Sequence, residues 1–157
     1  MKLNIGIAEK DLKSTNKLLG NILADEMVLY IKTRKAHWNV SGESFMELHK
    51  LFEGQYKQLE ESIDEVAERI GKLGEKTVGT MEEFMSLTSL KENPGKYDSS
   101  KVVIAELLDD HESVIIKLRK DINESADKNN DAGTADFFTG LMEQHETIAW
   151  VLRRYLN

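Results

Sequence analysis

The chain has 157 residues, a formal net charge of −7 and no cysteine. This length fits one domain with a core of its own. The absence of cysteine excludes disulfides, thiolate metal sites and thiol catalysis, and the acidic balance argues against a surface that grips nucleic acid all over. No apolar run reaches the length of a membrane span and the first residues lack a signal-peptide core, so we expect a cytoplasmic protein with no membrane partner.

The spacing of apolar residues predicts an all-α chain. Residues 1–8 are expected to form a short flexible tail. Long helices are then predicted over residues 10–38, 44–74, 100–125 and 134–156, the last two separated by a polar loop over residues 127–133. Ser44 and Glu47 have the spacing of a capping box at the start of the second helix, and Gly71 and Gly74 mark its end.

The connection over residues 75–99 is too long for the usual short loop of an up-down helix bundle. Its length predicts a crossover between the second and third long helices, which changes the topology of the bundle. Residues 81–90 are predicted to form a short helix inside it, and Asn93-Pro94-Gly95 is a turn signal.

Five candidate metal ligands lie between residues 37 and 68: His37, His49, Glu53, Asp64 and Glu68. His49 and Glu53 are four residues apart, as are Asp64 and Glu68, and on a helix such pairs face the same way. Imidazole and carboxylate ligands without thiolate suit iron, manganese or zinc. The segment therefore predicts a metal centre.

Helix geometry prevents one straight helix from wrapping all these ligands around one ion. Glu53 and Asp64 are eleven residues apart, so they lie about 16 Å apart along the axis, whereas metal–ligand bonds are only about 2 Å long. Either the chain carries two half-sites, or a second copy completes one site. An antiparallel two-fold mate is our leading hypothesis, because two-fold contacts are the commonest in homo-oligomers.

The pattern H-W-x-V-x-G-x5-L-H-x3-E, starting at His37, is followed by I-D-x-V-A-E-R-I, starting at Ile63. Together they resemble the signature of the Dps family, the DNA-protecting proteins of starved cells, also called miniferritins. The resemblance implies a single ferritin-like four-helix bundle domain over residues 1–157, with a short extra helix between helices two and three. It also implies a hollow dodecamer with a ferroxidase centre between two-fold mates.

Transferred to this chain, the family's catalytic and metal-binding ligands would be His37, His49 and Glu53 of one subunit with Asp64 and Glu68 of its mate. The resemblance implies an iron-storage protein that oxidises Fe(II) with hydrogen peroxide or dioxygen and stores Fe(III) as mineral, so that DNA escapes oxidative damage. Iron would be handled without an organic cofactor.

The resemblance also implies acidic pores that draw iron inward. Asp131 and Asp136 are the candidates here, with Asp127 a weaker one, although family members often carry a further acid where this chain has Gly140. The competing interpretation is that these carboxylates cap the fourth helix, whose N-terminus favours negative charge.

An alternative function is a non-specific DNA-binding protein of the nucleoid that protects DNA physically. Residues 1–10 carry Lys2 and Lys10, offset by Glu9. Phosphate contacts by so few lysines would be weak and salt-sensitive, although twelve copies would add avidity. We therefore expect DNA to be at most a weak partner.

Three further side chains allow two interpretations each. His111 and His145 lie within the apolar stripes of their helices, and we predict hydrogen-bonded core histidines rather than ligands. Trp38 directly follows a predicted ligand, so it either packs beside the iron site and absorbs stray oxidising equivalents or packs in the core.

Overall fold

The computed structural model describes residues 3–156, and Met1, Lys2 and Asn157 lie outside the described residues. All regular structure in the described range is helical, which confirms the predicted all-α class. None of the described helices is both long and apolar enough to cross a membrane. The elements are α1 (Glu9–Asn39), α2 (Phe45–Lys72), α3 (Met81–Leu87), α4 (Ser100–Asn123), the π-helical turn η1 (Glu124–Lys128) and α5 (Ala132–Leu156).

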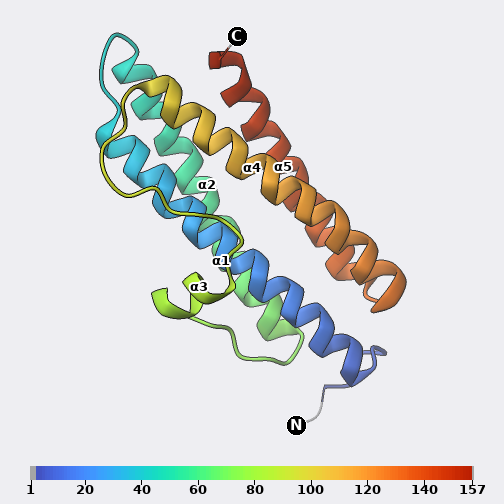
Figure 1. Ribbon diagram of the computed structural model, residues 1–157. Helices are drawn as coiled ribbons and strands as arrows, with labels where there is room; N and C mark the ends of the chain where they lie inside the picture. The colour runs from blue at the N-terminus through green and yellow to red at the C-terminus, as the bar shows by residue number, and fades with distance from the viewer. Residues whose placement is uncertain (1–2, 157) are drawn as a thin grey trace.

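The four long helices form a bundle in which α1 pairs with α2 and α4 pairs with α5 (Figure 1). The end of α2 returns to the start of α1, where Asn16 Nδ2 donates to the Leu73 carbonyl oxygen at 3.4 Å. The connection then runs back along the bundle, so that α4 starts beside the end of α1, where Ser100 Oγ donates to the Ser41 carbonyl oxygen at 3.2 Å. The predicted crossover with its short helix, α3, is therefore confirmed.

The core takes its large apolar side chains from all four long helices, as their apolar stripes predict. Leu3 and Ile7 also pack against this core, whereas Ile5 between them is 49% exposed. The largest apolar side chains that are almost completely buried are Leu19, Ile22, Leu23, Leu29, Leu48, Phe52, Leu59, Leu107, Leu118, Phe138 and Leu152.

Two details at the helix ends differ from the sequence prediction. Ser44 does precede α2, but its side chain makes no capping hydrogen bond, and its φ of −93° and ψ of 20° lie outside the extended conformation typical of an N-cap residue. The Glu47 carboxylate accepts instead from the Tyr155 hydroxyl at 2.7 Å. A complete capping box occurs at Thr80 and Glu83, where α3 begins. At the other end of the bundle, α4 continues into η1, so the polar loop before α5 is shorter than predicted.

Asp25 on α1 is completely buried and holds the crossover against the bundle. Its carboxylate accepts hydrogen bonds from the Thr88 hydroxyl at 2.8 Å and from the Ser89 amide at 2.6 Å. Lys117 Nζ on α4 completes the set at 2.6 Å. Because a buried carboxylate is stable only when it is paired, these contacts fix the position of the crossover where it follows α3.

The next residue, Glu26, begins a second buried network that joins α1, α5 and α4. Glu26 Oε1 lies 2.6 Å from His145 Nε2, and His145 Nδ1 lies 2.8 Å from His111 Nδ1. One of these two facing Nδ1 atoms must donate and the other accept. Both histidines are thus hydrogen-bonded core residues, as predicted. Burial, and to a smaller extent the neighbouring His145, hold the pKa of His111 well below its usual range.

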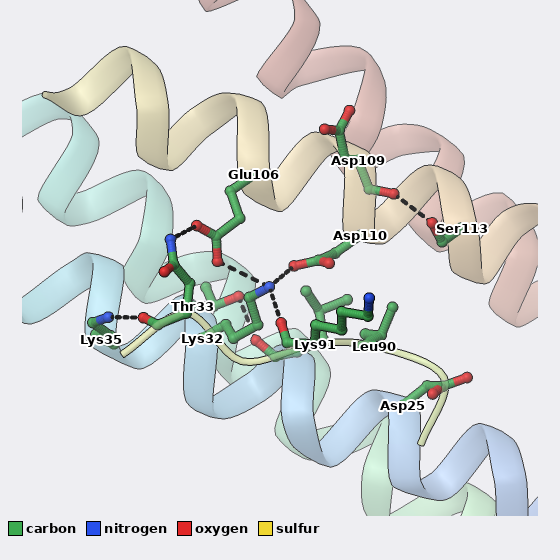
Figure 2. A network of polar contacts seen from close by, with 12 residues as sticks. Asp25, Lys32, Thr33, Lys35, Leu90, Lys91, Glu106, Asp109, Asp110 and Ser113 are labelled. Carbon is green, nitrogen blue, oxygen red and sulfur yellow. Dashed lines mark hydrogen bonds and ion pairs between the residues drawn. The ribbon is translucent and has the colours of Figure 1, made fainter. Parts of the chain in front are cut away.

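Lys32 forms the third buried polar contact of α1, in the middle of the network that Figure 2 shows. Its ammonium group lies 2.9 Å from Glu106 Oε1 and 2.5 Å from Asp110 Oδ2 on α4, and it donates to the Lys91 carbonyl oxygen at 2.8 Å. Burial raises the pKa of Asp110. At Glu106 burial acts in the same direction, but hydrogen bonds from Asn93 and Lys32 outweigh it and lower the pKa.

Replacing this lysine tests how far the network holds α1, α4 and the crossover together. Lys32→Met would leave two partly buried carboxylates, with side chains 18% and 13% exposed, without their shared buried cation, so we expect a loss of about 3 kcal/mol in the free energy of unfolding. The control is Lys13→Met, which removes an exposed pair with Glu9 and should change stability by less than about 1 kcal/mol. Urea unfolding measures both, and equal losses would contradict the assignment.

The depressed pKa of His111 predicts acid sensitivity. A histidine that stays neutral in the fold stabilises it above the unfolded pKa near 6.5. Below that pH, His111 is protonated in the unfolded chain but stays neutral in the folded chain, so the free energy of unfolding falls. His111→Gln keeps hydrogen-bonding groups but has no group that titrates in this range. Between pH 7 and pH 5 its free energy of unfolding should therefore fall by up to about 2 kcal/mol less than that of the parent. Unfolding curves that fall in parallel for both proteins would refute this role.

Candidate metal centre

His37 and His49 are brought together by the turn between α1 and α2. His37 lies in the last turn of α1 and His49 near the start of α2, and residues 40–44 reverse the chain between them. Gly42 adopts a φ of +97° in this turn, a conformation that favours glycine. As a result the two imidazole rings stack with centroids 3.8 Å apart and an interplanar angle of 21°.

Reciprocal hydrogen bonds fix the tautomer of both rings. His37 Nδ1 lies 2.8 Å from the His49 carbonyl oxygen, and His49 Nδ1 lies 2.9 Å from the His37 carbonyl oxygen. A carbonyl oxygen can only accept, so both Nδ1 atoms carry the proton. In the neutral rings both Nε2 atoms therefore keep their lone pairs, which is the form in which histidine binds metal.

Neighbouring aromatic rings hold the two histidines in place. His37 is 9% exposed and meets the Tyr56 ring edge-to-face at 5.2 Å between centroids. His49 is half-buried, with Phe45 at 5.0 Å. Rings that are hydrogen-bonded and packed in this way lose little freedom on binding an ion.

Glu53 follows His49 by one helical turn and points a half-exposed carboxylate into solvent. Lys57 Nζ lies 2.5 Å from its Oε1 atom. The hydrogen bond and the charge of Lys57 lower the pKa of Glu53, with smaller effects of His37 and His49 in the same direction. Glu53 is thus ionised at neutral pH and suited to bind a cation.

Asp64 and Glu68 lie further along α2, and both are exposed. Since α2 is continuous from Phe45 to Lys72, they are separated from His49 and Glu53 by several helical turns, about 16 Å between Glu53 and Asp64. Within residues 3–156 of a single chain, no three His, Asp or Glu side chains form a metal-binding group. The structure therefore brings His37 and His49 together, but in the single chain it gathers none of Glu53, Asp64 and Glu68 into a metal-binding group with them.

A groove of about 530 Å³ lies on the same face, between the histidines and Glu68. Its residues come from α1 (Met27 and Tyr30) and α2 (Glu60, Glu61, Ile63, Asp64 and Ala67). Glu60 and Glu61 are exposed, and Glu60 faces the Tyr30 hydroxyl at 3.5 Å. The groove thus combines an apolar floor with an acidic rim.

An aromatic cluster that was not predicted from the sequence surrounds Arg34, beside the histidines. The guanidinium carbon lies 4.4 Å from the Tyr56 ring centroid, 5.3 Å from that of Trp38 and 5.5 Å from that of Tyr30. Trp38 is 62% exposed, so the core-packing interpretation of this residue is wrong for the single chain. The i, i+4 spacing of Tyr30, Arg34 and Trp38 was a signal that could have found part of this cluster.

The predicted pore residues occupy two different environments. Asp131 is 2% exposed and caps α5, accepting from the Thr134 amide at 2.9 Å and the Thr134 hydroxyl at 2.6 Å. Arg69 Nη2 also lies 3.2 Å from Asp131 Oδ1, so the charge of this carboxylate is already balanced by the guanidinium group. Asp127 and Asp136 are exposed, and of these Asp136 lies one turn into α5.

Comparison with known proteins gives relatives over the whole chain. The ferritin family, described by a ferritin-like domain, matches residues 16–157. An uncharacterised low temperature-induced protein of Nostoc sp. (strain PCC 7120) is 44% identical over 156 residues, which cover 99% of this chain and 87% of that protein. DNA protection during starvation protein 2 of Bacillus anthracis is 34% identical over 145 residues, covering 92% and 98% of the two chains.

Solved structures agree with these relatives. The Dps protein of Vibrio cholerae O1, described as a member of a broad superfamily of ferritin-like diiron-carboxylate proteins, superposes with a TM-score of 0.92 at 28% identity. The alignment covers 100% of this chain and 98% of that one. The helical architecture, the histidine pair and these relatives lead to one conclusion: the chain belongs to the Dps family of ferritin-like proteins.

Proposed function

We propose that this chain is an iron-storing ferroxidase. Its substrate is Fe(II), its oxidant hydrogen peroxide or, less readily, dioxygen, and its product an Fe(III) mineral held inside a hollow dodecamer. Membership of a ferritin-like family supports iron storage and protection of DNA in general terms. The observation that carries the specific proposal is the reciprocal hydrogen bonding of His37 and His49, which leaves both Nε2 lone pairs available.

The ligand set suits Fe(II) as substrate. His37 and His49 supply neutral imidazole donors, and Glu53 supplies an ionised carboxylate. Asp64 and Glu68 of a two-fold mate add two further carboxylates. Nitrogen and oxygen ligands of this kind suit iron, and a set that leaves coordination positions open admits an oxidant.

Electron counting explains why peroxide suits this centre. Each Fe(II) gives up one electron and hydrogen peroxide takes two, so two Fe(II) and one peroxide react without leaving a hydroxyl radical. Protection of DNA then follows from the chemistry, because both reagents that generate the radical are consumed together. The acidic balance of the chain, −7 per subunit, favours the concentration of cations around such an assembly.

Entry of iron through acidic pores is part of the same proposal. Asp136 is the better candidate for a pore carboxylate because it is exposed. Asp131 is occupied by Arg69 and Thr134 and would shape the start of α5 rather than attract iron itself.

Removing the two histidines tests the centre directly. His37→Ala with His49→Ala removes both nitrogen donors. Loss of a residue that only hydrogen-bonds to a metal ligand typically costs about 10–100-fold, so for loss of the ligands themselves we expect rapid Fe(II) oxidation by peroxide to fall at least about a hundredfold. Stopped-flow ferric absorbance measures the rate, and a sizing column checks that the assembly is intact. Oxidation at the parent rate in an intact assembly would refute the site.

Subunit mixing tests whether the centre is shared between two chains. Asp64→Ala/Glu68→Ala should also be inactive, whereas Glu61→Ala/Glu65→Ala, with the same charge change on the same helix, should stay active. When the histidine double variant and the Asp64/Glu68 double variant are co-assembled at random, each mixed pair regains one of its two sites. Activity should then return to roughly a quarter of the parent value for a two-fold pair.

The mixing experiment separates the two arrangements that spacing alone leaves open. If each chain carried two independent half-sites, neither variant would supply what the other lacks. Activity that stays at the level of the separate variants after verified co-assembly would therefore contradict the shared centre.

A further inference from the structure

Both glutamates of the proposed centre are paired with a lysine one helical turn further along α2. Lys57 Nζ lies 2.5 Å from Glu53 Oε1, and Lys72 Nζ lies 3.0 Å from Glu68 Oε2. The third carboxylate, Asp64, has Glu68 rather than a lysine four residues on. The two lysines therefore accompany the two half-sites, one in each.

An antiparallel mate would bring these two pairs to the same place. Glu53 with Lys57 from one chain would then meet Glu68 with Lys72 from the other, next to Asp64. Without metal, three carboxylates would share this small region, and their mutual repulsion would oppose the contact. Two ammonium groups on the glutamates offset most of that charge.

We propose that Lys57 and Lys72 are resident cations of the metal-free centre, which hold Glu53 and Glu68 until a divalent metal displaces them. This inference rests on the proposed function, because it requires the centre to be shared between two-fold mates. Binding of one divalent ion releases two singly charged ammonium groups, so the exchange leaves the charge on the carboxylates balanced. The lysines thus stabilise the empty contact and weaken metal binding at the same time.

These two effects distinguish the proposal from ordinary helix stabilisation. Glutamate and lysine four residues apart stabilise any helix slightly, and exposed pairs contribute little to folding. Glu9 and Lys13 on α1 provide a matched pair away from the centre, at 3.1 Å with side chains 61% and 65% exposed. The corresponding values for Glu68 and Lys72 are 60% and 62%.

The test is a titration of the assembled, metal-free protein with Co²⁺ alone, followed by calorimetry and by the visible absorption of the bound ion. Lys57→Gln/Lys72→Gln should bind Co²⁺ roughly tenfold more tightly, because two positive charges no longer oppose the ion. Lys57→Arg/Lys72→Arg, which keeps both charges, should bind within about twofold of the parent. Lys13→Gln should bind as the parent does.

A second readout reports the empty contact. Metal-free Lys57→Gln/Lys72→Gln should dissociate into smaller species at higher protein concentration than the parent, and Co²⁺ should reverse this. Unchanged Co²⁺ affinity in that variant, or an equal gain in Lys13→Gln, would overturn the inference while leaving the proposed centre intact. Failure of the parent to bind Co²⁺, or parent-like binding by His37→Ala/His49→Ala, would instead overturn the proposed centre itself and the inference with it.

Discussion

Three charged side chains buried in α1 determine how the rest of the bundle is arranged around it. Asp25 reaches the crossover and Lys117, Glu26 reaches His145, and Lys32 reaches Glu106 and Asp110. A buried charge without its partner is strongly destabilising, so each contact permits only one sliding position of α1 against its neighbours. Apolar packing by itself tolerates many such positions, and we infer that these polar contacts select one of them.

The sliding position of α1 against its neighbours also determines where the candidate centre lies. The last turn of α1 carries His37, and the short turn to α2 leaves the ring opposite His49, where each backbone carbonyl accepts from the other histidine. The backbone at the helix ends thus orients both rings before any ion arrives. Such preorganisation lowers the cost of ordering the two rings, whereas Glu53 is half-exposed and Asp64 and Glu68 are exposed.

The rise of an α-helix explains why one chain would hold only part of the proposed centre. At about 1.5 Å per residue, a continuous α2 cannot fold its own carboxylates back to its own histidines. The carboxylates of Asp64 and Glu68 would therefore meet a histidine pair only on another molecule. The apolar groove between the halves, with Met27, Tyr30, Ile63 and Ala67, is consistent with contact by a second chain on this face. Assembly and chemistry are in this view consequences of the same helix geometry.

The helices, the crossover and the candidate ligands could be predicted from the sequence by itself. Apolar periodicity predicted the four long helices to within a few residues, and the length of the 75–99 connection predicted the crossover. The fixed helical rise already divided the candidate ligands into two sets, His37, His49 and Glu53 on one side and Asp64 and Glu68 on the other. These features are local, because they depend on residues a few turns apart on one helix.

Only the tertiary structure decided which polar residues are buried and what they contact. Asp25, Glu26 and Lys32 are of residue types that are usually exposed, yet all three are buried and contact partners on other helices. The predicted capping box is absent at Ser44, and the Glu47 carboxylate instead accepts from Tyr155, far along the chain. Trp38 lies exposed over Arg34 and Asp131 is neutralised by Arg69. Such partners depend on how helices pack against one another, and helical periodicity contains no information about pairing between distant segments.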